Sequence, residues 1–265
     1  MVMAMIRKVA PRAISPSFRI MKLVQKRTGR SIIGGPFRGL KYIDQSIGSA
    51  YIPKLLGTYE RELQPTLRKV VSSSPDTILD IGAAEGYYAV GLATICKARI
   101  VAFECVEAGR KLMHQFARQN DSPRNLQVEG LCTPEALRIT LNDAGRAVIL
   151  MDVEGAEDSL LDPRLIPRLK ATQIIVEMHD FIVPGVTDRI IARFAQSHII
   201  ERIDQEPRSA QDLPFTNSFP DVLKLFPKRY LDWAVSEHRP VKMHWLHLTP
   251  RMQTAAHFDS NASGQ

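Results

Sequence analysis

A glycine-rich turn between an apolar run and an amphipathic run is the segment of this chain best suited to hold a nucleotide. The apolar run Thr77–Ile81 includes Asp80 and leads into Gly82 and Gly86, after which a helix is expected to begin near Tyr87. A strand, a tight turn and a helix in this order place backbone N–H groups beside a ligand at the carboxyl end of the strand. Glycine lets the backbone approach such a ligand closely and adopt a positive φ.

The spacing within this turn disfavours a dinucleotide. A dinucleotide-binding loop has the pattern G-x-G-x-x-G, whose third glycine packs the helix against the strand. Here the second position is Ala84 and the third is Tyr87, while Glu85 places an anion where a pyrophosphate would lie. Both features count against a nicotinamide-dependent oxidoreductase. They suit a ligand without phosphates and with a cationic amino-acid end near Asp80 and Glu85, and S-adenosylmethionine is such a ligand.

A second acidic residue falls at the distance from the turn at which nucleotide folds bind a ribose. The predicted strand Arg99–Glu104 ends in Glu104, 18 residues after Gly86, close to the ~20-residue spacing expected for such an acid. Its carboxylate offers two acceptor oxygens to two vicinal hydroxyls. We therefore predict a cofactor site made of Asp80, Gly82, Ala83, Glu85, Gly86, Tyr87, Glu104, Cys105 and Asp152.

Candidate catalytic residues follow the fourth predicted strand, Ala147–Val153. Asp152 and Glu154 share one side of this strand if it persists that far. If S-adenosylmethionine is the ligand, transfer of its methyl group to a hydroxyl would need an aligned nucleophile and a base or metal to take or polarise the hydroxyl proton. Asp152 is the first candidate for this role, or for positioning the methionine end of the cofactor, and Glu154 is the second. The alternative is a structural role, because Glu157 and Asp158 fall in the first turn of the following helix, where anions are stabilised.

The end of the fifth predicted strand, Gln173–Met178, adds an acid and an imidazole. Glu177 and His179 alternate and so point the same way, and a Glu in a buried strand is costly unless it is paired or functional. With Asp152 nearby, the three groups could form an acid/base cluster or hold a divalent cation. The spacing carries no strong metal signature, so we assign no metal ligand. We give His179 an acid/base or substrate-orienting role, with a hydrogen-bonded structural histidine as the alternative.

The chain from Thr77 onwards alternates short apolar runs with longer amphipathic ones. Near-continuous apolar strands separated by helices are typical of a parallel sheet covered on both faces. The further predicted strands are Leu126–Glu129, His198–Ile203 and Val241–Leu248. The predicted helices are Ile52–Val71, Tyr87–Cys96, Ala108–Gln119, Pro134–Asn142, Asp158–Leu169, Asp188–Gln196 and one near Asp221–Val235. We therefore expect an α/β, Rossmann-like, doubly wound fold.

The positive charge of the chain is concentrated near its N-terminus. Of 265 residues, 35 are Lys or Arg and 28 are Asp or Glu, and residues 1–43 hold ten of the basic ones and none of the acidic ones. The remainder is mildly acidic. A hydrophobic share of 45%, three cysteines without a C-x-x-C pair and no apolar run long enough to span a bilayer indicate a globular protein of a reducing compartment, and we expect it in the cytoplasm. An organelle transit peptide stays an alternative, because the arm is rich in Arg and lacks acids.

The basic arm could be a solvated extension, a helix packed on the protein's own body, or a contact for an anionic partner. Its apolar residues favour a weak contact with an anionic membrane over nucleic acid. Nucleic acid is disfavoured further because Phe18 and Phe37 are isolated and form no set for stacking bases. The apolar residues in question are Met5, Ile6, Ile20, Met21, Leu23 and Val24.

Three motifs together resemble the FkbM-type branch of class I S-adenosylmethionine-dependent methyltransferases. They are the loop Asp80-Ile-Gly-Ala-Ala-Glu-Gly86, the strand end Phe103-Glu104 and the family-specific Met151-Asp-Val-Glu-Gly-Ala-Glu157. The segment Gly57–Leu63 also resembles the helix that leads into the fold, so the resemblance covers about residues 57–177. The loop departs from the family, which often has Asn-Ile where this chain has Ala84-Glu85.

The resemblance implies a seven-stranded, mostly parallel sheet with an antiparallel last strand. We expect an N-terminal helical or basic extension beside it, which the motifs do not cover. The resemblance also implies S-adenosylmethionine as cofactor and methyl transfer to a hydroxyl oxygen of a small molecule or glycan. A methyltransferase fold that binds the nucleotide without turnover and acts as a scaffold is the alternative. We expect a basic arm (1–43), a methyltransferase domain (44–253) whose insert at 205–240 is a candidate substrate lid, and a flexible tail (254–265). Nothing in the sequence identifies the acceptor or the oligomeric state.

Overall fold

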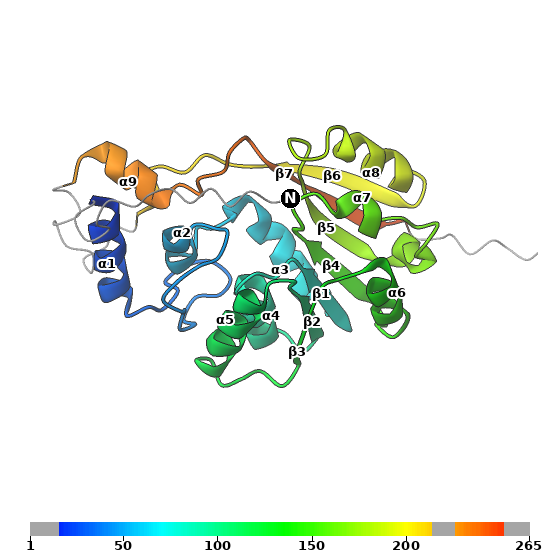
Figure 1. Cartoon of the computed structure of the whole chain (residues 1–265), viewed down its shortest axis with the longest axis horizontal. Helices are drawn as coiled ribbons and strands as arrows, with labels where there is room; N and C mark the ends of the chain where they lie inside the picture. The colour runs from blue at the N-terminus through cyan, green and yellow to red at the C-terminus, as the bar shows by residue number, and fades with distance from the viewer. Residues whose placement is uncertain (1–15, 214–225, 252–265) are drawn as a thin grey trace, which may run out of the picture.

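The strands form one seven-stranded sheet in the order β3-β2-β1-β4-β5-β7-β6 (Figure 1). The computed structural model describes residues 16–213 and 226–251. Strands β1 to β5 run parallel, and β7 lies antiparallel to both β5 and β6. Their bounds are β1 Thr77–Ile81, β2 Arg99–Phe103, β3 Leu126–Glu129, β4 Ala147–Met151, β5 Gln173–Met178, β6 His198–Asp204 and β7 His244–Pro250. The predicted Rossmann-like α/β fold, with a mostly parallel sheet and an antiparallel last strand, is confirmed.

Helices cover both faces of this sheet because its strands are apolar on both sides (Figure 1). Successive residues of β1 alternate between two cores, so that Ile78 packs with the helices of one face and Leu79 with those of the other. On the Ile78 face lie α3 (Gln64–Ser72), α4 (Tyr87–Ile95) and α5 (Glu107–Arg118). On the Leu79 face lie α6 (Pro134–Asn142), α7 (Glu157–Leu160) and α8 (Val186–Phe194).

The N-terminal segment from residue 16 is packed into the body. α1 (Pro16–Thr28) lies against α2 (Tyr51–Leu56) and α9 (Lys228–Val235) at one end of the molecule, on the left in Figure 1. Ile20 and Val24 of α1 are fully buried in the same core as the central sheet. Residues 16–43 of the arm therefore contribute to the core, as the alternative of a helix packed on the protein's own body expects, and the domain boundary at residue 43 stays a prediction.

The same burial changes the argument for a membrane contact. Ile20 and Val24, which we counted among the apolar residues of the arm, face the protein interior. Met5 and Ile6 lie outside the described residues, and the membrane contact stays a prediction. No helix among the described residues is long and apolar enough to cross a membrane.

The helix predicted over Ile52–Val71 is interrupted in the structure. Its first part, α2, ends at Leu56 and is capped by Gly57, which has a φ of +73°. A Cβ on Gly57 would lie 2.0 Å from the carbonyl oxygen of Gly34, so the chain can turn here only because two glycines approach each other. The second part consists of the short helix η2 (Arg61–Leu63) and α3.

The helix predicted over Asp158–Leu169 is also broken. α7 ends at Leu160 and is followed by η3 (Pro167–Ala171). Pro163 and the proline that opens η3 lack the N–H group that a continuous helix requires. β4 ends at Met151, two residues earlier than predicted, and the chain leaves the sheet there.

The structure describes residues 205–213 and 226–240 of the insert. The insert contains η4 (Ala210–Asp212) and α9, whereas residues 214–225 and the predicted tail at 254–265 lie outside the described residues. Strand β7 begins at His244, three residues later than predicted.

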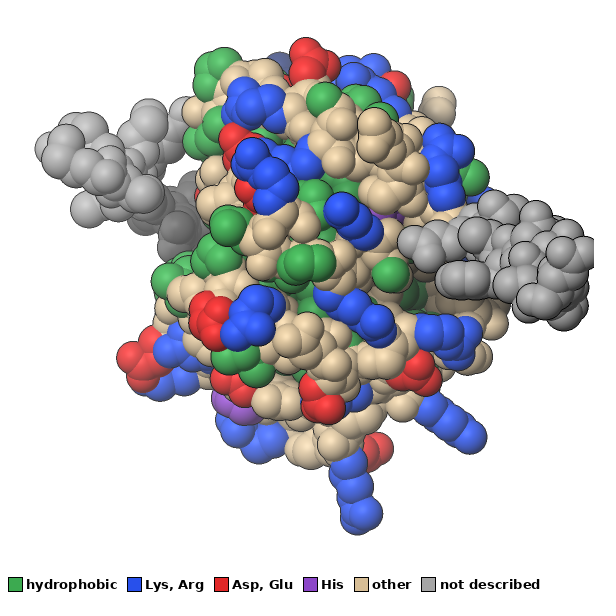
Figure 2. All heavy atoms as spheres, turned by 90° about the vertical axis from the view of Figure 1, so that its right-hand side faces the viewer, with side chains coloured by type: hydrophobic (Ala, Val, Ile, Leu, Met, Phe, Trp, Pro, Cys, Tyr) green, Lys and Arg blue, Asp and Glu red, His purple; other side chains and the backbone are tan. Residues whose placement is uncertain are grey.

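One face of the surface shows how the exposed charges are distributed. In Figure 2, Lys and Arg side chains are interspersed with Asp and Glu side chains and form no continuous basic stripe. The described residues on this face therefore present both signs of charge side by side.

Candidate functional site

A cavity of about 680 Å³ opens at the carboxyl ends of the central parallel strands. Its size is typical of a small-molecule site, and open α/β sheets bind their ligands at this edge. The predicted site residues that line it are Asp80, Gly82, Ala83, Tyr87, Glu104, Cys105, Asp152, Glu154 and His179. Two others, Glu85 and Gly86, lie outside its lining.

Gly82 lies where the ends of β1 and β4 approach each other. It has a φ of +86°, and a Cβ at this position would lie 1.7 Å from the carbonyl oxygen of Asp152. The Asp152 N–H donates to the Ile81 carbonyl at 2.9 Å, which joins the two strand ends. From the sequence we expected a ligand to approach at this glycine. The lack of a side chain at Gly82 instead lets the backbone of Asp152 approach. This contact fixes Asp152 at the edge of the cavity.

Glu104 is anchored at the end of β2 by backbone donors. Its two carboxylate oxygens accept hydrogen bonds from the N–H groups of Ala84 and Val106, each at 2.7 Å. Gly109 of α5 lets the helix pack close, since a Cβ there would lie 2.9 Å from Glu104 Cγ. A carboxylate has about four lone-pair sites, so each oxygen can accept a further hydrogen bond while the group stays in place.

Glu85 has a structural role, and its predicted contact with the cofactor needs correcting. The side chain is fully buried and forms an ion pair with Lys54. It also accepts hydrogen bonds from Tyr42 and Ser46, each at 2.6 Å, and from the Ile47 N–H at 3.1 Å. Burial alone would raise the pKa of Glu85, but Lys54 and these donors lower it to about 2. Its carboxylate therefore ties the segment before α2 to the glycine turn.

The next two residues of the turn pack α4 in place. Gly86 has a φ of +86°, and a Cβ there would lie 2.5 Å from Met113 Cγ, so this glycine lets α4 approach α5. Tyr87 is buried but reaches the cavity lining, and its hydroxyl has no hydrogen-bond partner among the described residues. Burial raises the pKa of Tyr87, which keeps this hydroxyl a donor.

Asp80 is a buried acid of the cavity wall. It is 4% exposed, and within residues 16–213 and 226–251 its Oδ2 finds no hydrogen-bond partner. Burial raises the pKa of Asp80 to about 7, the backbone of Ala89 opposes this, and the charges of Asp152 and Glu104 add to it. A buried acid with an unsatisfied oxygen in a cavity favours a cationic or hydrogen-bond-donating ligand.

His179 is held between carboxylates at the ends of β4 and β5. Its Nδ1 lies 2.5 Å from Glu157 Oε1, and its Nε2 lies 3.4 Å from Asp152 Oδ1 and 3.7 Å from Glu177 Oε2. Burial alone would lower the pKa of His179, but the Glu157 hydrogen bond and the acids around the ring raise it above its ordinary value. The imidazole is therefore placed to hold or accept a proton at Nε2.

Glu157 positions His179, a role that the sequence reasoning missed. It does open α7 as predicted, but it is fully buried and also accepts a hydrogen bond from the Gly155 N–H at 3.1 Å. The sequence feature that could have indicated this role is the place of Glu157 at the end of the Asp-Val-Glu-Gly-Ala-Glu motif. Glu154, in contrast, is exposed on the cavity lining with a φ of +47°. A turn separates it from Asp152, so the shared strand face that we predicted does not exist.

Arg239 is a cavity residue for which the sequence carried no signal. Its guanidinium forms ion pairs with Glu60, Glu177 and Glu237, the last with an N–O distance of 3.0 Å. Burial raises the pKa of Glu60 to about 7 although Arg239 opposes this. Burial, together with the charges of Asp152 and Glu60, also raises the pKa of Glu177. The predicted need of Glu177 for a partner is thus confirmed.

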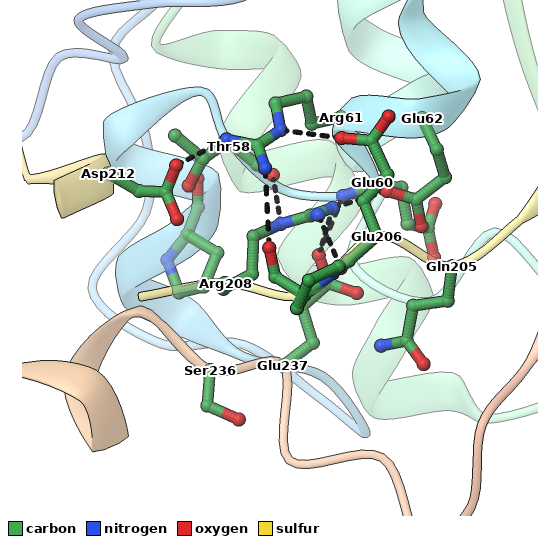
Figure 3. Close-up of polar contacts among 12 residues, drawn as sticks. Thr58, Glu60, Arg61, Glu62, Gln205, Glu206, Arg208, Asp212, Ser236 and Glu237 are labelled. Atoms are coloured by element: carbon green, nitrogen blue, oxygen red, sulfur yellow. Dashed lines mark hydrogen bonds and ion pairs between the residues drawn. The ribbon is translucent and has the colours of Figure 1, made fainter. Parts of the chain in front are cut away.

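A second arginine fastens the insert to the loop that follows α2 (Figure 3). Arg208 lies 2.5 Å from Glu62 and 2.9 Å from Glu237, and Arg61 pairs in turn with Asp212. The C-terminal end of the insert, residues 237–240, lines the cavity, and the pair between Arg208 and Glu237 fastens it to the N-terminal end. The role of the insert as a lid stays a prediction.

No family model matches the chain, and no curated protein does either. Solved structures that it resembles include a precorrin-6y C5,15-methyltransferase from Geobacter metallireducens, with a TM-score of 0.46 and 13% identity over 70% of this chain and 87% of that one. A putative O-methyltransferase from Klebsiella pneumoniae has a TM-score of 0.44 and 11% identity over 91% and 94% of the two chains. The O-methyltransferase TomG from Streptomyces achromogenes, solved with SAM, has a TM-score of 0.45 and 11% identity over 89% and 90%. The FkbM resemblance stays a prediction.

Proposed function

We propose that this chain is an S-adenosylmethionine-dependent methyltransferase that methylates a hydroxyl oxygen of a small molecule or glycan. The observation that carries the proposal is the charge of the cavity. Its lining contains six carboxylates. Glu177 and Glu237 pair with Arg239, whereas the other four have no Lys or Arg partner among the described residues: Asp80, Glu104, Asp152 and Glu154. The two Lys or Arg side chains of the same lining, Lys54 and Arg239, are both engaged in buried ion pairs.

This charge selects among nucleotides. A phosphate group needs N–H donors or unpaired cations, and a surplus of carboxylates repels it. A nucleoside with a sulfonium and an ammonium group gains from the same carboxylates. The anchored carboxylate of Glu104 supplies acceptors for two ribose hydroxyls, and Asp80 supplies one for a cationic end.

His179 and Asp152, which also line the cavity, can take the proton that an acceptor hydroxyl loses. Bound S-adenosylmethionine supplies an electrophilic methyl group, and the acceptor oxygen must lose its proton as it attacks. His179 is held by Glu157 with its Nε2 directed toward Asp152 and Glu177, so it can receive that proton and keep its orientation. Asp152 stabilises the imidazolium that results.

Calorimetric titration of the purified chain tests the proposal. We expect S-adenosylmethionine and S-adenosylhomocysteine to bind with micromolar-scale dissociation constants, and NAD not to bind. Glu104→Ala should lose two hydrogen bonds to a charged acceptor, worth about 2–4 kcal/mol, which is a loss of roughly 30-fold to 1,000-fold in affinity. Glu107→Ala is the matched control, because this glutamate of α5 is exposed and pairs with Lys111.

Two outcomes would reject the proposal. Tight NAD binding without a response to the sulfonium nucleotide would show that the charge of the cavity was misread. An unchanged affinity in Glu104→Ala would remove this carboxylate from the ribose site. Because Glu104 also anchors the turn, the melting temperature of each variant is measured first, and Glu104→Gln provides a second, nearly isosteric variant.

A further inference from the structure

Three side chains with metal-binding atoms converge at the inner end of the cavity. Asp152 follows β4, Glu177 lies in β5 and His179 follows β5, and one ligating atom from each lies within 4.8 Å of the other two. β4 and β5 are neighbouring parallel strands, with Met151 opposite Val176. Adjacent carboxyl ends of the sheet thus bring the three groups together, and all three line the cavity.

The hydrogen bonds leave a place between these groups that only a proton or a cation can fill. Glu157 lies 2.5 Å from His179 Nδ1, so this nitrogen carries a proton and donates it to the carboxylate. The remaining nitrogen, Nε2, then faces Asp152 Oδ1 at 3.4 Å and Glu177 Oε2 at 3.7 Å. In neutral histidine all three of these atoms are acceptors, and acceptors that converge without a donor repel one another.

An unsatisfied oxygen at this place points to a missing ligand. Asp152 Oδ1 is shielded from solvent and accepts no hydrogen bond from any described residue. Buried polar atoms in folded proteins are rarely left without a partner unless an ion, a water or a ligand satisfies them.

The distances from His179 Nε2 to the two carboxylate oxygens are close to those between ligands of one metal ion. With metal–ligand distances of about 2.1 Å, neighbouring ligands of an octahedral ion lie about 3 Å apart and opposite ones about 4.2 Å. The separations of 3.4 and 3.7 Å lie between these values. The other oxygen of Glu177 pairs with Arg239, which leaves Oε2 for the ion and holds the carboxylate in orientation.

The arrangement around His179 is also one that proteins use to support a bound metal. A histidine that binds a metal through one nitrogen usually donates the other N–H group to a carboxylate. Glu157 provides that carboxylate from a fully buried position. A donor set of one imidazole and two carboxylates suits Mn²⁺ and similar transition ions better than Ca²⁺, which prefers oxygen ligands alone.

We propose that Asp152, Glu177 and His179 bind one divalent cation of the Mn²⁺ class, with Glu157 as the positioning residue behind His179. Three protein ligands leave coordination positions open toward the cavity. An acceptor hydroxyl bound there would lose its proton more easily, because a bound cation lowers the pKa of an oxygen ligand. With the cation in place His179 Nε2 is a ligand and takes no proton, so the proton of the acceptor passes to solvent in the cavity. This catalytic consequence rests on the proposed methyl transfer, whereas binding of the cation does not.

The binding claim is tested on the full chain without nucleotide. Protein treated with a chelator is titrated with Mn²⁺ at pH 7.5, and free Mn²⁺ is followed by its electron paramagnetic resonance signal. We expect one site, and an affinity at least tenfold lower in Asp152→Asn and in Glu177→Gln. Glu157→Gln should weaken binding by about tenfold, the lower end of the range for an outer carboxylate. Asp188→Asn is the control, because this aspartate is exposed on α8 outside the cavity.

A second measurement uses only the wild-type chain, so its result does not depend on whether the variants fold. Pulsed electron paramagnetic resonance of the Mn²⁺ complex should show the ¹⁴N coupling of one bound imidazole. The proposal is overturned if the wild type binds no Mn²⁺, because a proton then fills the place between the three groups. It is overturned equally if the control and the ligand variants bind alike, or if no nitrogen coupling is seen. Nucleotide binding, measured separately without Mn²⁺, shows whether the proposed function fails on its own.

Discussion

The buried ion pair between Lys54 and Glu85 offers a direct test of how the glycine turn is held. Neither side chain is more than 4% exposed. Breaking a buried pair by neutralising one partner costs about 3–5 kcal/mol, because the other charge stays buried without compensation. We expect Glu85→Gln to lower the free energy of unfolding by about this amount, or the melting temperature by roughly 5–9 °C in a chain of this size.

The pKa of Glu85 gives a second route to the same magnitude. It falls from the ordinary 4.5 to about 2 on folding, and each tenfold change in a dissociation constant corresponds to about 1.36 kcal/mol, so the group contributes about 3 kcal/mol at neutral pH. Because the pKa is lower in the folded state, this contribution is complete above about pH 4.5 and is lost as the pH falls toward 2. Glu85→Gln should therefore lose stability at pH 7 and show a flatter decline below pH 4.5.

Urea unfolding at pH 7 and at several values between 5 and 2.5 measures both effects. Glu135→Gln is the control, since Glu135 forms an exposed pair with Arg138 and should change stability little. Lys54→Met combined with Glu85→Gln should cost less than the sum of the single changes, because the two groups interact directly. A Glu85→Gln chain that is as stable as the wild type at pH 7 would refute this account of the turn.

Two further predictions concern the cofactor and the N-terminal helix. Binding of the sulfonium nucleotide should tighten as the pH rises through 7, because Asp80 has a pKa of about 7 in the free site and a cation favours its charged form. Calorimetry between pH 6 and 8 should show this dependence weakened in Asp80→Asn, and a pH-independent wild type would contradict it. Ile20→Ala should lower the free energy of unfolding by about 2–5 kcal/mol, since α1 belongs to the core. Lys22→Ala, at an exposed position of the same helix, should change it little, and equal effects in denaturant unfolding would show that α1 is not packed as described.

The parallel sheet could be predicted because its strands are continuous apolar runs. Thr77–Ile81, Leu126–Glu129 and Gln173–Met178 were predicted with the bounds that the structure has. The helix over Ile52–Val71 was wrong because its amphipathic pattern hides a tertiary constraint: Gly57 must adopt a positive φ to pass Gly34. Such a contact joins segments that are distant in sequence, and no local pattern reports it.

Local sequence patterns likewise predicted some of the cavity residues, whereas others depend on tertiary contacts. Glu104 and Asp152 were found because their strand ends and spacing mark them, and both line the cavity. Glu85 was misplaced because the direction of a side chain within a turn depends on its partners, here Lys54. Arg239 was missed because its importance comes only from the acids that the fold brings around it.

The measurement that tests the central claim most directly is a crystal structure of the chain with S-adenosylhomocysteine. The account predicts that the ribose hydroxyls lie on the carboxylate of Glu104, that the amino-acid end lies near Asp80, and that the sulfur faces Asp152 and His179. A nucleotide bound away from Glu104, or with its sulfur turned away from His179, would contradict it.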